Sequence, residues 1–151
     1  MDQARRRVLK GGGAVGVLTW LGAAGVVSFP AHAAEPVFAI HGVAAVMEAL
    51  GAAGATESAA VEIHAAEIVE NGAMVPVEVV SRVPASRQIA LLVDQNPTTL
   101  AALFDLPEGT APQLQTRIKM AKTSHVIALV EAEGGFHVAR REIKIVQGGC
   151  A

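Results

Sequence analysis

The fold is decided by the stretch VEIHAAEIVENGAMVPVEVV, residues 61–80. Apolar and polar side chains alternate over its first half, which is the period of a half-buried strand. A second apolar run, 74–80, follows Asn71-Gly72, and this dipeptide between two apolar runs predicts a β-hairpin. Pro76 lies inside the second run and suits an edge strand or a bulge. Residues 61–80 therefore predict an antiparallel β-structure.

The rest of the chain extends this prediction. Short apolar or alternating runs separated by Gly, Pro and Asn residues predict five more strands. Together they make about seven strands in under a hundred residues, which favours an all-β fold, an antiparallel β-sandwich of immunoglobulin-like architecture. The Cys…Trp…Cys pattern of antibody domains is missing. The five further strands are expected at 87–94, 99–104, 114–120, 124–130 and 136–145.

The last of these strands has a change of parity. Phe136 and Val138 lie on one face of an extended chain, whereas Ile143 and Ile145 fall on the other. Because a strand with one buried face keeps a single parity, the sequence predicts a β-bulge near Arg140-Arg141.

The first 33 residues have the pattern of an export signal. Arg5-Arg6-Arg7-Val8-Leu9-Lys10 precedes an apolar run over 11–29 and a small-residue site ending at Ala33. Paired arginines before such a run are typical of a twin-arginine signal peptide. A membrane anchor is the alternative, because 19 residues are enough to span a bilayer. Six glycines weaken the run, so we expect residues 1–33 to be cleaved and the mature chain to be periplasmic.

The composition limits the number of domains and the classes of function that the mature chain can have. The full sequence has 151 residues, 52% of them apolar, and a formal net charge of −2. Without residues 1–33 it keeps eight basic and thirteen acidic residues. With no basic patch and almost no aromatic residues, it has none of the features of a nucleic-acid-binding protein. Its length suits one globular domain.

A short helix is expected before the sandwich. Ile40, Val43, Met47 and Leu50 recur at helical spacing, and glycines follow them. This pattern predicts one amphipathic helix within residues 34–54, with a packing role. The β-domain would then occupy residues 55–146.

The sequence offers no pattern for a metal site, a cofactor site or an enzyme active centre. Its mature histidines are scattered, without the spacing of metal ligands. Glu67 and Glu70 could share a helical face, but their segment reads as strand, so paired acid–base work is doubtful. The histidines are His41, His64, His125 and His137.

Cys150 is the one group suited to covalent chemistry, and it is the only cysteine. It follows Gly148 and Gly149, whose backbones sample both signs of φ. The five residues 146–150 reach about 16–18 Å when extended, which is enough to enter another protein's cleft. A free thiol ionises near pKa ~8.5, so activation would have to come from a partner enzyme. An incidental thiol, an intermolecular disulfide and a cloning remnant are the other readings.

Four separated motifs resemble the SoxY family, the sulfur-carrier subunits of the Sox thiosulfate-oxidising system. They occur in the family's order and cover essentially the whole chain. They are IVENGAMVPV (68–77), DQNP (94–97), RIKMAKT (117–123) and Gly148-Gly149-Cys150.

The resemblance implies an immunoglobulin-like domain in a heterodimer with SoxZ. It implies that Cys150 is the covalent attachment site for thiosulfate-derived sulfur, and that Gly148 and Gly149 are the hinge of a swinging arm, residues 147–151. In the family, the heme protein SoxXA joins thiosulfate oxidatively to the thiol and SoxB releases sulfate by hydrolysis. SoxCD, where present, oxidises the remaining sulfane sulfur. The chain is thus expected to be a carrier and not an enzyme.

One departure from the family pattern concerns the tail. The family's tail usually ends Gly-Gly-Cys-Gly-Gly, whereas Ala151 alone follows Cys150 here. The expected tip is shorter by about 3.5 Å, with a carboxylate nearer the sulfur. An alternative function therefore stays open: a divergent periplasmic β-sandwich binding or assembly subunit that no longer carries sulfur.

Overall fold

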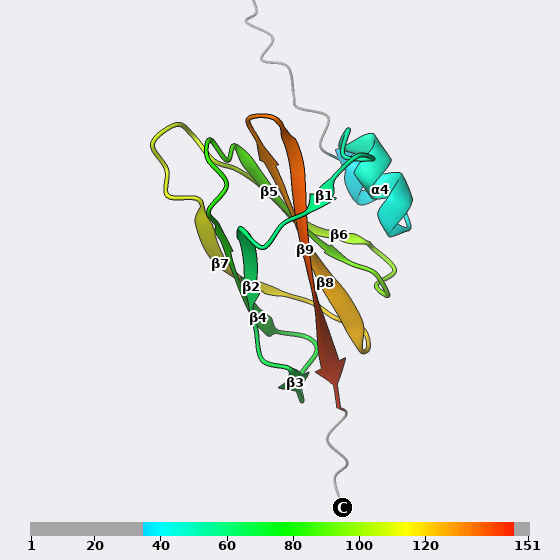
Figure 1. The fold of residues 1–151 in the computed structure, drawn as a ribbon. Helices are drawn as coiled ribbons and strands as arrows, with labels where there is room; N and C mark the ends of the chain where they lie inside the picture. The colour runs from blue at the N-terminus through cyan, green and yellow to red at the C-terminus, as the bar shows by residue number, and fades with distance from the viewer. Residues whose placement is uncertain (1–34, 147–151) are drawn as a thin grey trace, which may run out of the picture. The chain divides into compact units, whose positions relative to one another are not determined.

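The computed structural model describes residues 35–146 (Figure 1). Two short helices precede nine strands, seven of which correspond to the predicted ones. The helices are α3 (Glu35–Phe38) and α4 (Val43–Ala49). The strands are β1 (Thr56–Glu57), β2 (Val61–His64), β3 (Ile68–Val69), β4 (Val75–Ser81), β5 (Gln88–Val93), β6 (Leu100–Asp105), β7 (Gln113–Ile118), β8 (Ser124–Ala132) and β9 (Gly135–Ile145).

The strands form two sheets. The larger has the order β1-β9-β8-β5-β6, and β3 pairs with β9 beside it; the smaller has the order β2-β4-β7. Neighbours are antiparallel, except that β1 and β3 run parallel to β9. Figure 1 shows the small sheet lying against the large one, with α4 on the other side of the large sheet. The predicted β-sandwich is confirmed.

A core of aliphatic side chains fills the space between the sheets. Val75, Val77 and Val79 of β4 are buried there, as are Ile89 and Leu91 of β5. Each such side chain contributes about 1.5–3 kcal/mol when it is removed from water. The alternation read from residues 74–80 therefore points its apolar positions into this inter-sheet core.

A second core lies on the opposite face of the larger sheet. Leu92 of β5 and Leu129 of β8 pack there with Val46 of α4, and all three are at most 2% exposed. Strands β5 and β8 are therefore buried on both faces. This explains why their sequences are continuously apolar and not alternating.

The single helix expected over 34–54 is replaced by two short ones. Gly42 separates α3 from α4 with a φ of 89°, a conformation that breaks a helix. Its N–H donates to the Thr99 hydroxyl at 2.8 Å, so the break is tied to the loop before β6. The apolar spacing was read correctly as a packing face, but a glycine interrupts the helix.

The bulge predicted near Arg140-Arg141 is absent. Strands β8 and β9 pair without a register shift from Ser124↔Ile143 to Ala132↔Gly135. The parity changes because β9 serves both cores: Val138 packs in the helix-side core and Ile143 in the inter-sheet core. The change of parity in the sequence therefore reflects burial on both faces of β9 and not a bulge. The register shift in the larger sheet lies elsewhere, between Leu91 and Leu92 in the β5–β6 pair.

The hairpin predicted at Asn71-Gly72 is partly right. Strands β2 and β4 do pair antiparallel, from Val61↔Ser81 to His64↔Glu78. Their connection is the long segment 65–74, which contains β3. Asn71 closes a small turn in which its Oδ1 accepts the Ala73 N–H at 3.0 Å. The dipeptide therefore marks a turn, but it does not join two paired strands directly.

Pro76 sits in β4, the central strand of the smaller sheet. It pairs with Arg117 of β7, and the Ser81 N–H to Pro112 O bond of 2.8 Å sets the alternation along this pair. That alternation turns the Pro76 nitrogen away from β7 and towards the side of β2. Since β2 pairs only as far as Glu78, no ladder bond is lost there, and Pro76 occupies a local edge.

Candidate functional site

The three predicted site residues lie outside the described residues. Gly148, Gly149 and Cys150 belong to 147–151, and the structure describes the chain only as far as Val146. What it does describe is the point from which this tail departs, the end of β9 (Figure 1). The candidate site of the described domain is therefore the root of the tail, residues 144–146, together with the segments that hold it.

Strand β3 holds one side of the tail root. Ile68 pairs with Lys144 and Val69 with Ile145 in parallel register. The Lys144 N–H donates to the Glu67 carbonyl at 2.8 Å, and the Val146 N–H donates to the Val69 carbonyl at 3.1 Å. These bonds begin where β8 stops, since the β8–β9 ladder ends at Ile143. Without β3, the last residues of β9 would extend beyond the sheet.

The segment after β7 holds the other side. Thr123 Oγ1 accepts the Ile145 N–H at 3.1 Å. The Met120 N–H donates to the Gly72 carbonyl at 2.7 Å. A Cβ on Gly72 would lie 2.3 Å from the Met120 carbonyl oxygen and 3.3 Å from Cγ2 of Ile145. Gly72 is thus required because two backbone segments approach each other closely here. The sequence predicted Gly72 only as a turn residue.

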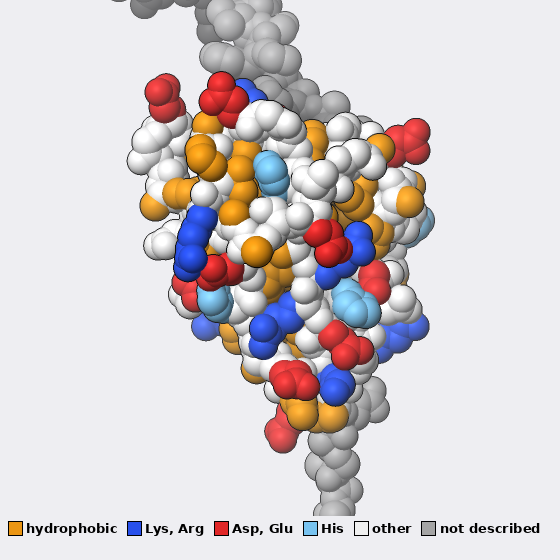
Figure 2. Space-filling model, in the orientation of Figure 1, with side chains coloured by type: hydrophobic (Ala, Val, Ile, Leu, Met, Phe, Trp, Pro, Cys, Tyr) orange, Lys and Arg blue, Asp and Glu red, His pale blue; other side chains and the backbone are white. Residues whose placement is uncertain are grey.

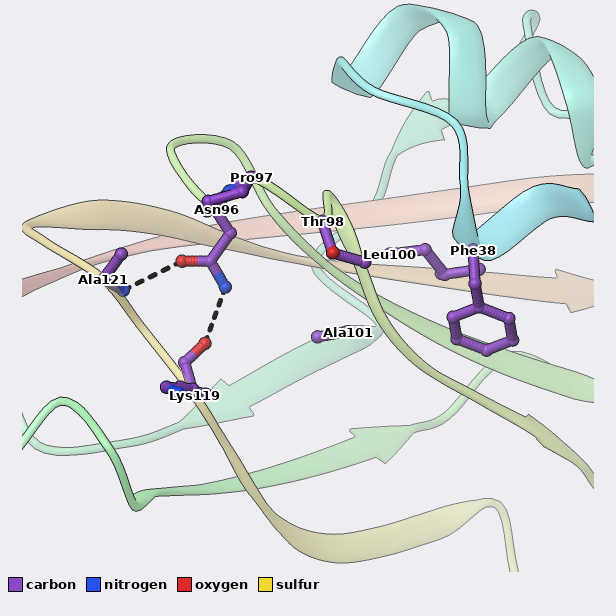
Figure 3. A pocket seen from close by; sticks show the side chains of 8 residues that line it. All are labelled: Phe38, Asn96, Pro97, Thr98, Leu100, Ala101, Lys119 and Ala121. Atoms are coloured by element: carbon purple, nitrogen blue, oxygen red, sulfur yellow. Dashed lines mark hydrogen bonds between the residues drawn. The ribbon is translucent and has the colours of Figure 1, made fainter. Parts of the chain in front are cut away.

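Asn96 ties a third segment to this region. Its Nδ2 donates to the Lys119 carbonyl at 2.6 Å, and its Oδ1 accepts the Ala121 N–H at 2.9 Å (Figure 3). An amide that donates on one side and accepts on the other fits this place, whereas a carboxylate could only accept. The loop between β5 and β6 is thereby fixed to the segment that touches Gly72.

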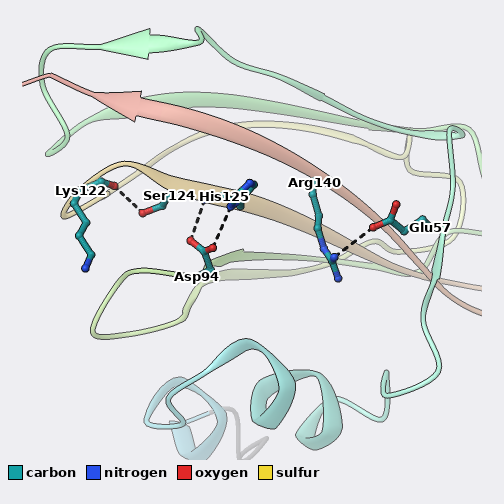
Figure 4. Close-up of polar contacts among 6 residues, drawn as sticks. All are labelled: Glu57, Asp94, Lys122, Ser124, His125 and Arg140. Carbon is teal, nitrogen blue, oxygen red and sulfur yellow. Dashed lines mark hydrogen bonds and ion pairs between the residues drawn. The ribbon is translucent and has the colours of Figure 1, made fainter.

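Asp94 and His125 form a neighbouring polar contact (Figure 4). Asp94 accepts the His125 backbone N–H at 2.9 Å, and its other oxygen lies 3.2 Å from His125 Nδ1. His64 pairs separately with Glu62 at 3.3 Å. Within residues 35–146, no group of His, Cys, Asp and Glu side chains has the geometry to hold a metal ion. Asp94 therefore orders the start of β8, which leads away from Thr123.

Glu67, one of the two glutamates considered for acid–base work, faces a lysine. Glu67 Oε1 lies 3.6 Å from Lys144 Nζ. Both side chains are exposed, so this ion pair contributes little to stability. Glu67 acts mainly through its backbone carbonyl at the tail root.

Apolar side chains are exposed around the tail root. Ile68 and Met74 are each 57% exposed and Val146 is 44% exposed; they are the large exposed hydrophobic residues of the described part of the chain. Figure 2 shows apolar atoms at the end of the domain where the tail leaves it. An exposed apolar patch on an otherwise polar surface is typical of a contact surface. We call Ile68, Met74 and Val146 the root patch.

Three motifs that are far apart in the sequence therefore meet at one end of the domain. Segment 68–77 touches 117–123 through Gly72, 94–97 touches it through Asn96, and the tail root is bonded to 68–77 at Val69 and to 117–123 at Thr123. None of these contacts forms a catalytic constellation. Their shared effect is to fix the position and direction of the chain as it leaves Val146.

The chain is similar to known proteins over most of its length. The family described as "Sulfur oxidation protein SoxY" matches residues 46–150, a span that includes Cys150. The sulfur carrier protein SoxY from Chlorobium limicola f thiosulfatophilum is 36% identical, with a TM-score of 0.60 over 67% of this chain and 88% of that one. No curated protein matches the sequence.

A further solved structure shares the fold alone. The superoxide reductase (neelaredoxin) from Ignicoccus hospitalis is 22% identical, with a TM-score of 0.51 over 57% of this chain and 80% of that one. None of the helices within residues 35–146 is long and apolar enough to cross a membrane. With its family match over most of its length, the chain belongs to the SoxY family of sulfur oxidation proteins.

Proposed function

We propose that this chain is a periplasmic covalent carrier of sulfur intermediates in thiosulfate oxidation, and that Cys150 is the attachment site. The observation that carries the proposal is the fixed tail root. Val146 is bonded to Val69, and its neighbour Ile145 is bonded to Thr123, only a few residues before the cysteine. A thiol on a short arm with a fixed base can be presented to several enzymes in turn.

The proposed chemistry has two balanced steps. The Cys150 thiolate and the outer sulfur of thiosulfate form a disulfide bond, and two electrons pass to the heme protein SoxXA. Water then attacks the sulfonate sulfur in SoxB: sulfate leaves with two protons, and a persulfide stays on Cys150. SoxCD would oxidise that remaining sulfur. The chain supplies the thiol and its position, and the enzymes supply the electron transfer and the activated water.

Tethering gives this arrangement its advantage. An intermediate held on the chain is delivered at high effective concentration and need not be recaptured from solution. The five residues 146–150 allow a reach of about 16–18 Å from the root. Gly148 and Gly149, as the proposed hinge, would let the arm pass through a narrow channel because they have no Cβ. The root patch adds an apolar surface where an enzyme's channel entrance would meet the domain.

The proposed partners and location follow from family membership. SoxZ would be the heterodimer partner, and SoxXA, SoxB and SoxCD would bind transiently. Residues 1–33 would direct twin-arginine export, and because this route carries folded proteins, SoxZ could cross with the chain.

The test is Cys150→Ser in a reconstituted system containing SoxZ, SoxXA and SoxB. We expect thiosulfate oxidation to be lost, and thermal melting of the parent and the variant checks that the loss does not come from unfolding. Mass spectrometry of peptide 145–151, isolated without reductant, should show a sulfur adduct on the parent and none on the variant. Unchanged oxidation by the variant would contradict the proposal and favour a binding subunit that carries no sulfur.

A matched pair of variants tests the hinge. Gly149→Val should slow every partner reaction, because a β-branched residue narrows the backbone freedom and widens the arm. Gly149→Ala should have a smaller effect of the same sign. Equal turnover by the parent and Gly149→Val would refute the role of this glycine.

A further inference from the structure

Strand β6 forms an open edge of the larger sheet. Its sequence is Leu100-Ala101-Ala102-Leu103-Phe104-Asp105, without a charged side chain before its last residue. Natural edge strands usually carry lysine, proline or a covering segment, because an open edge pairs readily with other chains. The register shift lies near Ala101. Within residues 35–146, no strand pairs with residues 102–104 on their open side, although helix α3 contacts β6.

The other strand edges of the described domain are protected. Strand β7 exposes Gln113, Gln115 and Arg117. Strand β2 carries Glu62, which pairs with Arg82 at 3.0 Å. On the far side of the larger sheet, β1 and β3 are two residues long each. Of these edge strands, β6 alone is both apolar and of ordinary length, six residues.

The backbone of β6 is oriented for pairing. The Leu106 N–H donates to the Arg87 carbonyl at 2.7 Å, which sets the alternation of bonds with β5. Since hydrogen-bonded and non-hydrogen-bonded pairs alternate, the N–H and C=O groups of Leu103 and Asp105 point to the open side. These four groups are complementary to the backbone of an added strand.

The side chains of β6 also favour an occupant. Phe104 lies opposite Ile89 on the inter-sheet face, is only partly buried and is packed against neither core. Partly exposed aromatic residues of this kind are common anchors at protein interfaces. A hollow of about 540 Å³ adjoins the start of the strand, lined on one side by Phe38, Pro97 and Leu100 (Figure 3).

We propose that the edge of β6 is the docking surface for the partner subunit, which adds an extended strand and places an apolar side chain in the hollow. This inference rests on the proposed heterodimer with SoxZ. Backbone bonds would supply affinity, while Phe104 and the hollow would supply specificity, as in other cases of strand addition. The larger sheet would then continue from one subunit into the other.

Proline substitution tests the backbone contact with a matched control. Asp105→Pro removes an N–H that points to the open side and keeps the backbone bonds to β5, although the exposed bond from the Gln88 amide to the Asp105 carboxylate, 2.8 Å, is lost with it. Gln115→Pro makes the same change on β7, where the alternation set by Ser81 and Pro112 also turns the N–H outward. Phe104→Lys tests the aromatic contact. Each purified chain is mixed with purified SoxZ, the dissociation constant is measured by calorimetry, and folding is checked by thermal melting.

We expect Asp105→Pro and Phe104→Lys to weaken SoxZ binding at least 10-fold, and Gln115→Pro to change it less than twofold, at unchanged melting temperatures. Equal affinity of Asp105→Pro and the parent would overturn the inference, as would a loss confined to Gln115→Pro. If Asp105→Pro abolished only self-association in sedimentation experiments, the edge would pair with a second copy and the inference would also be wrong. Failure of the parent chain to bind SoxZ would instead count against the proposed heterodimer, while thiosulfate loading of Cys150 tests carriage separately.

Discussion

Gly72→Ala is expected to destabilise the domain and loosen the tail root. The added Cβ would lie 2.3 Å from the Met120 carbonyl oxygen, far inside normal contact distance. Because this neighbour is backbone and not a flexible side chain, the two segments must move apart. The bond from the Met120 N–H to the Gly72 carbonyl would be strained by the same movement.

The magnitude follows from the cost of overpacking. Forcing a methyl group into a filled space costs about 1–3 kcal/mol. For a domain of about this size, each kcal/mol lowers the melting temperature by about 4–6 °C. We therefore expect Gly72→Ala to melt about 5–15 °C below the parent. The amide of Ile145, whose Cγ2 would lie 3.3 Å from the added Cβ, should exchange its hydrogen faster.

The assay is thermal melting followed by circular dichroism, together with hydrogen exchange. Gly54→Ala is the matched control, because a Cβ there meets nothing within 4 Å and the residue has no positive φ. This control should melt at the parent's temperature or slightly above, since alanine restricts the unfolded chain. If Gly72→Ala and Gly54→Ala melted within 1 °C of each other, the close approach of residues 72 and 120 would not be essential.

Three further substitutions test other parts of the site. Thr123→Val removes the acceptor of the Ile145 N–H, and the loss of about 1 kcal/mol should speed hydrogen exchange at that amide about fivefold, with little change at β5 amides. Asn96→Asp cannot donate to the carbonyl facing it and should cost about 1–3 kcal/mol in urea denaturation, whereas Asn71→Asp keeps its accepted bond and should be nearly neutral; equal costs would refute this account of Asn96. Ile68→Glu in the root patch should raise the KM of SoxB for the loaded carrier about 5–10-fold, a contact worth about 1 kcal/mol, at an unchanged melting temperature; an unchanged KM would show that the patch does not touch the enzyme.

The fold could be predicted from the sequence because its strands carry strong patterns. The alternation over 74–80 and the continuous apolar run of 124–130 gave the correct strands, since each pattern reflects which faces are buried. The patterns did not show which strands are neighbours. The parity change in β9 was read as a bulge because one-sided burial was assumed, whereas α4 creates a second core on the other face.

The site was less predictable for a different reason. Cys150 and its glycines stand out by residue type, but the contacts that hold the root of their arm are mostly made by backbone atoms. Glu67, Val69 and Gly72 contribute carbonyl groups at the tail root and its neighbouring segment, and a carbonyl has no signature in the sequence. The close approach at Gly72 depends on a segment almost fifty residues away. In the sequence these motifs marked a family resemblance, and nothing in them indicated that they meet at one end of the domain.

The length of β9 has a mechanical consequence. If a partner bound the proposed arm and then separated from the domain, tension would be applied at Val146 along the axis of β9. Paired residues from Ser124↔Ile143 to Ala132↔Gly135 join β9 to β8, so a pull along the strand loads this whole ladder in shear and not one bond at a time. Strand β9 also contributes Val138 and Ile143 to the two separate cores, so extracting it would disrupt both. The fold therefore resists unfolding by a force applied at the C-terminal end of β9.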